Sequence, residues 1–207
     1  MNIIKPSHEI IDGLDAPAIM RKLEACGRIA YKSEDKIAPG TAEKFLAGIL
    51  KRGHESVIEH VTLSVKFICD RGVTHELVRH RLCAFTQEST RYCNYGKLGM
   101  TFIKPCFWQP GTTEYLLWLK SMEEAEFKYL QLLEIKATPQ EARSVLPNSL
   151  KTEIICTANL REWRHILKLR TSKAAHPQMR EVMLPLLAEF RKALPVIFGD
   201  IEVELPA

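Results

Sequence analysis

Residues 79–92 read RHRLCAFTQESTRY, in which three basic side chains precede a polar run that contains a further arginine. Arginine is always charged, and its planar guanidinium presents a fork of N–H donors that matches the oxygens of phosphate and carboxylate groups. So many basic groups in one short segment indicate a strongly anionic ligand. A solvated basic helix followed by a polar turn is the alternative interpretation of the same residues.

The chain that leads into the arginines has apolar residues at helical spacing, which predicts a helix over residues 72–82. On this helix Glu76 would neighbour His80, four residues further on. Arg79 and Arg81 would point away from each other. They could then serve two different ligands, or two copies of one site across a subunit interface.

The polar run after residue 84 alternates with a period of two, which is typical of extended chain. Gln87, Ser89 and Arg91 alternate with Glu88 and Thr90. A strand would place the amide, the hydroxyl and the guanidinium of the first three on one face. Such a row of groups suits a phosphate or a nucleobase.

Further from this stretch, hydrophobic spacing, caps and prolines predict the other elements. Asp15 and Thr41 are expected to cap the helices beside them. The apolar residues of the longest helix are Tyr115, Leu116, Leu119, Met122, Phe127, Leu130 and Leu133. The mixture predicts an α+β fold, with a mostly antiparallel sheet packed with helices that include this long amphipathic one. Helices are predicted at 16–31, 41–51, 112–136, 139–145, 160–169 and 177–194, and strands at 2–11, 60–69, 99–104, 150–157 and 196–205.

Length and charge limit the class of protein. A chain of 207 residues can bury one substantial core, so we expect a single domain over residues 1–207. The net charge of +4 fits small anionic ligands better than nucleic acid, whose binding domains usually have a pI above about 9. No apolar run has the length of a signal peptide or a membrane span. We therefore expect no nucleic-acid partner and no membrane partner.

The six cysteines are scattered along the chain. No two of them are spaced as CxxC, so we expect neither a metal site nor dithiol chemistry. A chain of this size does not need a disulfide framework. Scattered free thiols predict a cytoplasmic location. The cysteines are Cys26, Cys69, Cys83, Cys93, Cys106 and Cys156.

Several short motifs follow one another in a fixed order. Together with Arg-His-Arg-(seven residues)-Ser at residues 79–89, their order and approximate spacing from about residue 50 to 182 resemble those of the flavin-dependent thymidylate synthases. The further motifs are Gly53-His54-Glu55-Ser56, Glu59-His60, Arg143-Ser144-Val145-Leu146-Pro147, Asn159-Leu160-Arg161, Leu169-Arg170 and His176-Pro177-Gln178.

The resemblance implies reductive methylation of dUMP to dTMP. NADPH reduces bound FAD, the carbon comes from 5,10-methylenetetrahydrofolate, and the reduced flavin completes the methyl group with a hydride. The resemblance also implies a homotetramer whose active sites are shared between subunits. The sequence has no Gly-rich dinucleotide-binding loop, so FAD would bind by another device.

The resemblance also implies the residues that contact FAD. Asn159 precedes a predicted helix and could act as its cap instead. Arg161 and His165 lie one helical turn apart, so both could reach one ligand, although a histidine here could equally lie unused on the surface. His54 matches a family histidine near the flavin, with a buried structural role as the alternative. The positions that match FAD contacts are Ser56, Arg79, His80, Arg81, Gln87, Asn159, Arg161 and His165.

A second set matches the positions that contact dUMP. Arg91 and Arg143 are expected to bind the phosphate, at roughly 1.5–3 kcal/mol for each charged hydrogen bond. Arg143 could instead interact with the dipole of a helix that it ends. Glu76 departs from the family, which usually has glutamine there, and it could accept a proton from the uracil edge or pair with an arginine. The dUMP positions are Glu76, Arg79, Gln87, Ser89, Arg91, Arg143 and Arg170.

Arg170 is the expected catalytic residue. The resemblance implies that it lies against the uracil ring, where a fixed guanidinium would stabilise developing negative charge by about 3–4 kcal/mol. An exposed arginine that ends a helix is the alternative. Ser89 is not expected to be a nucleophile, because no general base is assured beside it and the family needs no protein nucleophile.

Two other functions fit the sequence. One is a nucleotide- or RNA-binding module without catalysis, in which Phe85 and Tyr92 would stack on bases beside the arginines. The other is a family member that binds flavin but has lost methylation, for which Glu76 is the suspect residue. Flavin colour would separate the first from a synthase, and turnover of dUMP would separate the second.

Overall fold

The computed structural model describes residues 1–203, which form two compact units. The first unit comprises residues 1–8, 66–79 and 85–155. The second comprises residues 9–65 and 80–84 together with the described chain from residue 156 onward. The expectation of a single domain over residues 1–207 stays a prediction.

The strands form the mostly antiparallel arrangement that the sequence predicts. Two short strands, β1 (Asn2–Ile4) and β5 (Thr101–Ile103), pair in parallel, with Ile3 opposite Phe102. The main sheet is antiparallel and has the order β2-β3-β6-β4. Its strands are β2 (Ser7–Ile10), β3 (Thr62–Asp70), β6 (Lys151–Asn159) and β4 (Ala84–Gln87).

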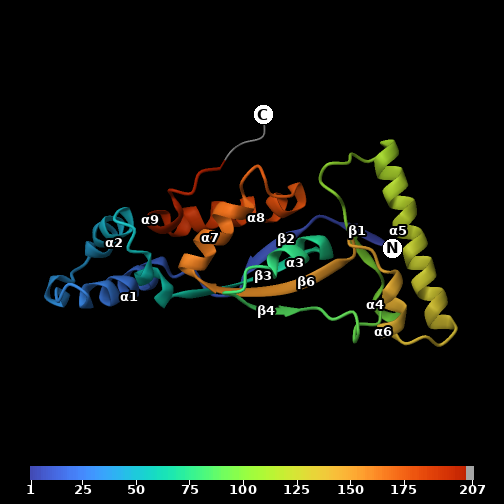
Figure 1. Cartoon of the computed structure of the whole chain (residues 1–207), viewed down its shortest axis with the longest axis horizontal. Helices are drawn as coiled ribbons and strands as arrows, with labels where there is room; N and C mark the ends of the chain where they lie inside the picture. The colour runs from blue at the N-terminus through green and yellow to red at the C-terminus, as the bar shows by residue number, and fades with distance from the viewer. Residues whose placement is uncertain (204–207) are drawn as a thin grey trace. The chain divides into compact units, whose positions relative to one another are not determined.

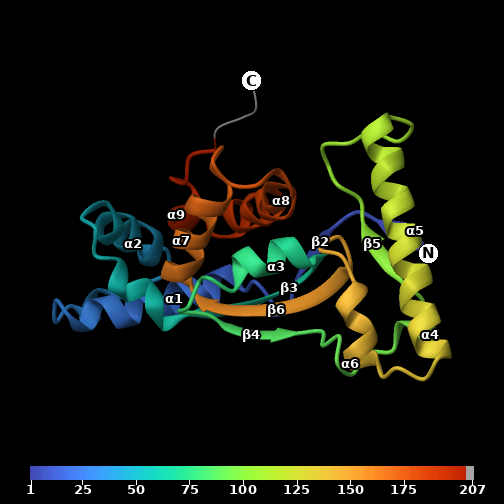
Figure 2. The same ribbon diagram turned by 45° about the vertical axis from the view of Figure 1, so that its right-hand side comes forward.

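The first unit has its own hydrophobic core around the long helix. Trp118, Met122 and Tyr129 of this helix are buried together with Phe102 of β5 and Leu150. In both views the long helix runs beside the short helices at residues 95–98 and 139–142, and Figure 2 shows β5 alongside it (Figures 1 and 2). The helical segments here are α3 (Arg71–Leu77), α4 (Tyr95–Leu98), α5 (Thr113–Glu134), α6 (Pro139–Ala142) and the 3₁₀ turn η3 (Arg143–Val145).

The second unit is mainly helical. The last three helices lie together (Figure 1). The rings of Trp163, Phe190 and Phe198, one from each helix, pack in succession with centroids 5.7 and 4.9 Å apart. The Trp163 ring N–H donates to the Leu63 carbonyl of β3 (3.0 Å). The helical segments are α1 (Ala16–Ile29), η1 (Glu34–Lys36), α2 (Thr41–Lys51), η2 (Glu55–His60), α7 (Leu160–Arg170), α8 (Pro177–Ala193) and α9 (Pro195–Phe198).

Proline and glycine explain two differences from the prediction. The expected strand at 2–11 is divided into β1 and β2 around Pro6, which has no N–H to donate to a ladder. Asp15 caps α1 as predicted, since its carboxylate accepts the Ala18 N–H (2.9 Å). Thr41 does not cap α2, because Gly40 occupies the cap position with a φ of 82°, a left-handed conformation that glycine adopts readily.

The stripe predicted for the longest helix was partly wrong. Met122 is buried as predicted, and Tyr115, Leu119 and Leu133 pack against the core. Leu116, Phe127 and Leu130 are exposed instead, while Trp118 and Tyr129 are buried. The helix has apolar residues on more than one side, so spacing alone did not define its inward face.

The last predicted strand, at 196–205, was also wrong over the described residues. Pro195 begins the short helix α9, consistent with the favourable position of proline in a first helical turn. Residues 201–203 have no regular structure, and residues 204 and 205 lie outside the described residues. Within residues 1–203, no helix combines the length and the apolar character needed to cross a membrane.

Candidate functional site

The basic residues of the central motif follow a helix and do not lie on it. α3 ends at Leu77, and the Arg79 N–H then donates to the Glu76 carbonyl (3.2 Å) in a tight turn. His80 is buried, whereas Arg79 and Arg81 are exposed. The helix predicted over residues 72–82 is confirmed as far as Leu77 and was wrong beyond it. The helical pairing of Glu76 with His80 was therefore wrong. Distant side-chain contacts of His80 override the helical spacing here.

The polar run after β4 forms a turn where extended chain was predicted. β4 ends at Gln87, and the Ser89 carbonyl accepts the N–H groups of Tyr92 (3.1 Å) and Cys93 (2.9 Å). The Ser89 hydroxyl accepts the Arg91 N–H (3.3 Å), a local bond that competes with strand pairing. The shared face of Gln87, Ser89 and Arg91 was therefore wrong. Within residues 1–203 the Ser89 hydroxyl has this one partner and no adjacent base.

Arg143 reaches this turn from far along the chain. It lies at the end of α6, as the helix-end alternative predicted, and its Nη1 donates to the Thr90 hydroxyl (3.3 Å). Thr90 is buried, while Arg91 and Arg143 are exposed. The first unit thus brings two guanidinium groups and the Ser89 hydroxyl to one turn. That is a suitable set of donors for an anion.

Two buried threonine hydroxyls hold the side-chain amide of Gln87. Its amide nitrogen lies 3.0 Å from Thr74 Oγ1 and 3.3 Å from Thr152 Oγ1. Thr74 lies on α3 and Thr152 on β6. Glu76, the next-to-last residue of α3, is half-buried.

Glu88 belongs to a polar network that the sequence reasoning missed. Its carboxylate accepts from the Tyr95 hydroxyl (2.8 Å) and from Lys151 Nζ (3.1 Å), and Lys151 also binds Glu153 (2.6 Å). Burial, together with the bond to Glu88, raises the pKa of Tyr95. The Glu88 side chain points to the opposite face of the chain from Gln87. Its contacts therefore hold the end of β4 in place and do not involve the turn at Ser89–Arg91. Single residues in a polar run gave no signal for them.

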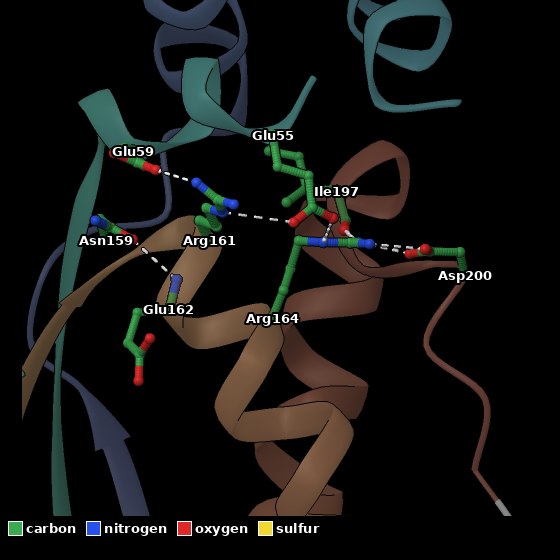
Figure 3. A network of polar contacts seen from close by, with 8 residues as sticks. All are labelled: Glu55, Glu59, Asn159, Arg161, Glu162, Arg164, Ile197 and Asp200. Carbon is green, nitrogen blue, oxygen red and sulfur yellow. Dashed lines mark hydrogen bonds and ion pairs between the residues drawn. The ribbon is translucent and has the colours of Figure 1, made fainter. Parts of the chain in front are cut away.

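In the second unit, α7 begins at the Asn159 motif. The Asn159 side chain accepts the Glu162 N–H (2.8 Å) and caps the helix, which confirms the capping alternative (Figure 3). Arg161 Nη1 donates to Glu59 (2.6 Å), and its Nε lies 3.7 Å from Glu55. His165 is on the exposed side of the same helix.

Arg164, also on α7, was not among the residues predicted from the sequence. It is buried and makes a bidentate ion pair with Asp200 (2.6 and 2.7 Å). It also donates to Glu55 (3.3 Å) and to the Ile197 carbonyl (Figure 3). The hydrogen bonds from Arg164 lower the pKa of Asp200. A buried, doubly bonded arginine ties α7 to the end of α9 and does not remain available to a ligand. Its position on a helix gave no sign of this burial.

His80 connects Arg170 to Glu162. Arg170 Nε donates to His80 Nε2 (3.0 Å), and His80 Nδ1 lies 3.5 Å from Glu162 Oε1. Burial, then the charges of Arg170 and His165, lower the pKa of His80 to about 4. The imidazole is therefore neutral at pH 7, accepts at Nε2 and carries its proton on Nδ1, facing Glu162. Arg170 ends α7 but is half-buried, so the exposed-arginine alternative was wrong.

His80, Glu162 and His165 also form a candidate metal site. They offer ligand atoms within 4.8 Å of one another. However, the Arg170 N–H already occupies His80 Nε2, so a cation here would lie beside a guanidinium. Burial raises the pKa of Glu162, which further weakens it as an anionic ligand. The expectation of no metal site stays a prediction.

The remaining predicted flavin residues are on the surface of their units. His54 is exposed, with Nδ1 3.1 Å from the Tyr31 hydroxyl, so the buried structural alternative was wrong. Ser56 on η2 and Arg81 after α3 are exposed as well. These side chains have the access that a large ligand requires.

A cavity of about 590 Å³ runs along α7 within the second unit. Its polar lining includes Asn159, Arg161, His165 and Lys168 and the carboxylates of Glu55, Glu59 and Glu162. Glu55 and Glu59 form ion pairs with Arg161. A larger cavity, of about 720 Å³, lies against α1 and contains none of the predicted site residues.

Comparison with known proteins agrees with these motifs. The family model described as thymidylate synthase complementing protein matches residues 15–196. The flavin-dependent thymidylate synthase of Corynebacterium glutamicum is 33% identical over 201 residues, covering 88% of this chain and 79% of its own. That of Pyrococcus furiosus is 36% identical over 169 residues, covering 80% and 69%.

A solved structure shows the same fold. A UMP/dUMP methylase from Streptomyces cacaoi, bound with 5-Br dUMP, superimposes with a TM-score of 0.77 at 23% identity and covers 96% of each chain. The predicted α+β fold is confirmed. With the ordered motifs and the extent of the family match, these findings identify the chain as an enzyme: it belongs to the flavin-dependent thymidylate synthase family.

Proposed function

We propose that this enzyme converts dUMP to dTMP by reductive methylation, with 5,10-methylenetetrahydrofolate as carbon donor, FAD as flavin and NADPH as reductant. Family membership supports the reaction class. The structural observation that carries the proposal is the approach of Arg143 to the turn at Ser89–Arg91. Arg143 contacts Thr90, 53 positions away, and so meets in one unit the turn that holds Ser89 and Arg91, which match dUMP contacts in the family.

The phosphate of dUMP would bind at this turn. Arg91 and Arg143 would donate to its oxygens, with the Ser89 hydroxyl as a third donor. The remaining members of the substrate set would position the sugar and base: Glu76, Arg79, Gln87 and Arg170.

The residues present fit FAD. The cavity along α7 offers Arg161 and His165 from one helical face, and the exposed Ser56 and Arg81 supply further donors. Asn159 uses its side-chain oxygen for the helix cap, which leaves its NH₂ group to donate. Arg79, His80, Gln87 and the flavin-adjacent His54 complete the proposed set. When bound, the flavin supplies the hydride chemistry.

Arg170 is the proposed catalytic residue. A neutral His80 accepts its Nε–H, which fixes the guanidinium without competing for its positive charge. The fixed cation would stabilise negative charge on the uracil ring, and no energy would be spent on reorienting it during the reaction. The proposal needs no protein nucleophile, in keeping with the isolated hydroxyl of Ser89.

We also propose a cytoplasmic homotetramer with active sites shared between subunits and no nucleic-acid or membrane partner. The family resemblance supports the assembly, and six free cysteines in the described chain agree with a reducing compartment.

The spectrum of the purified protein tests the proposed cofactor. We expect a yellow preparation with the absorption of oxidised flavin, and release of FAD on denaturation. A colourless protein that cannot be reconstituted with FAD would contradict the proposal and favour a binding module.

A further inference from the structure

We propose that a basic cavity between α1 and α2 binds the glutamate carboxylates of the folate substrate. This inference rests on the proposed function, because it takes 5,10-methylenetetrahydrofolate as the carbon donor. It gives a role to Arg28, Lys44 and Arg52, which belong to none of the motifs that resemble the family.

The cavity has a volume of about 400 Å³ and lies within the second unit. α1 and α2 lie beside each other in both views (Figures 1 and 2). Arg28 lines the cavity from α1, while Lys44 and Arg52 line it from α2 and its C-terminal cap. Within residues 1–203 no acidic residue lines this cavity, so its charge favours an anionic ligand.

The cations of α2 are spread along the helix. Lys44, Gly48 and Arg52 follow one another at intervals of four residues, so they lie on one face. Eight residues of helix correspond to about 12 Å along its axis, which separates the backbone positions of the two cations. Gly48 has no side chain to fill the space between them. Separated cations suit a row of separated carboxylates, such as a glutamate tail, better than one compact phosphate.

Arg28 is held in place by two neighbours. Its Nε and Nη2 donate to Glu24 Oε1 (3.1 and 2.7 Å), and its guanidinium carbon lies 4.4 Å from the centroid of the Phe45 ring. Among the described residues Nη1 has no partner, so it can donate to a ligand. Because the buried Glu24 balances the charge of Arg28, the net positive charge comes from Lys44 and Arg52, which are exposed.

Aromatic side chains connect the cavity with the proposed flavin site. Phe45 lines the cavity, and the Tyr31 ring meets it edge-on with centroids 6.2 Å apart. The Tyr31 hydroxyl lies 3.1 Å from Nδ1 of His54, the residue proposed to lie beside the flavin. Folate has its groups in a matching order: a pteridine that carries the transferred carbon, an aminobenzoyl ring and a glutamate tail. We expect the aminobenzoyl ring to pack on Tyr31 and the tail to reach the cations.

NADPH is the other anionic reactant of the proposed function. Its 2′-phosphate is one compact dianion, which converging donors would hold best. Lys44 and Arg52 are instead distributed along α2. The experiment therefore includes NADH, which lacks this phosphate, so that the two ligands can be told apart.

The experiment measures how much glutamate residues contribute to folate binding. Dissociation constants of tetrahydropteroate, tetrahydrofolate and tetrahydrofolate triglutamate are determined by titration of the FAD-loaded enzyme in the presence of dUMP. We expect wild type to bind the triglutamate at least about fivefold more tightly than tetrahydropteroate, because several modest ion pairs act together along the row. The preference should shrink at high salt, which screens exposed charges.

The variant K44Q/R52Q should reduce this preference to within about twofold, while its affinity for tetrahydropteroate stays within about twofold of wild type. The matched control K22Q/K51Q removes two exposed cations of the same helices outside the cavity and should keep the preference. All four positions are exposed, so neither variant should perturb folding. A preference kept in K44Q/R52Q, or lost equally in the control, would overturn the inference.

Two further comparisons separate the possible failures. If K44Q/R52Q keeps its glutamate preference but no longer distinguishes NADPH from NADH in the rate of flavin reduction, the cavity binds the 2′-phosphate and the inference is wrong. If wild type forms dTMP but binds the three folates equally, the inference fails and the proposed function stands. If wild type binds neither FAD nor dUMP, the proposed function fails, and the inference with it.

Discussion

At the scale of single residues, the contact between Arg170 and His80 governs the proposed chemistry. The imidazole has a pKa of about 4, so it accepts from Arg170 throughout the neutral range. A side chain on a helix end would otherwise sample many rotamers. Its hydrogen bond to a buried ring gives the guanidinium a fixed direction.

Arg170→Ala should lower the rate of methylation by about 10²- to 10³-fold, because it removes a preorganised positive charge. We expect the fold and the flavin content to be largely retained, as Arg170 lies at the end of α7 and is only half-buried. Single-turnover dTMP formation measures the effect, with thermal unfolding as the control for folding. A turnover equal to that of wild type would refute the catalytic role.

Arg91→Ala should weaken dUMP binding more than FAD binding. Arg91 lies in the turn that Arg143 approaches, and one charged hydrogen bond to phosphate contributes roughly 1.5–3 kcal/mol. Titration with dUMP and flavin content are the two measurements. Arg21→Ala, at an exposed position of α1, is the matched control and should change neither. Equal losses of both ligands on mutating Arg91 would show that its ligand is assigned wrongly.

His80 should make stability depend on pH. An unfolded chain takes up a proton on this histidine below its ordinary pKa of 6.5, whereas the folded protein does so only near pH 4. The unfolded state therefore binds more protons between these values, and the free energy of unfolding falls as pH drops from 6.5 to 4. The fall attributable to His80 is at most about 3 kcal/mol.

Glu162 has the opposite effect, because burial raises its pKa and favours folding when it is protonated. The comparison is therefore made between E162Q and E162Q/H80Q, by urea unfolding at several pH values. The single variant should lose more stability on acidification than the double variant. Parallel pH dependences would show that His80 is not buried as a neutral group.

At the scale of elements, Asn159 caps α7 and is also proposed to contact FAD, and mutations can separate these two roles. Asn159→Ala should lower the free energy of unfolding by about 1 kcal/mol, because it removes the cap of α7. Asn159→Asp keeps a capping oxygen and should retain most of this stability. Flavin content then reports the other role: a loss in the Asp variant assigns the NH₂ group to FAD. A stable Ala variant would contradict the capping role.

Most elements were predictable because their signals are local. The Asp15 cap and the alternating pattern of β3 were predicted from the sequence, and the structure shows both. The failures have distant causes. α3 ends at Leu77 because of contacts made by the next buried side chain, His80, and the burial of Arg164 depends on Asp200, 36 residues further on. A short stretch of sequence, of the length used to predict a helix or strand, does not contain both interacting residues.

At the scale of the whole molecule, the matched family region runs through both compact units, from residue 15 to residue 196. The resemblance therefore identified residues that periodicity could not connect, such as Arg143 with the turn at Ser89–Arg91. It did not reveal the contacts of Thr74 and Thr152 with Gln87, because neither threonine belongs to a motif of the family. Donor and acceptor geometry was needed to find them.

Tritium release tests the central claim most directly. The flavin-loaded enzyme is incubated with dUMP labelled at C5, 5,10-methylenetetrahydrofolate and NADPH, and tritium in water is measured together with dTMP. We predict that both appear in step, since the new methyl group replaces the hydrogen at C5, and that both cease when folate or reductant is omitted. Flavin-loaded enzyme that binds dUMP but releases no tritium, or that forms dTMP at the same rate after FAD is removed, would contradict the account.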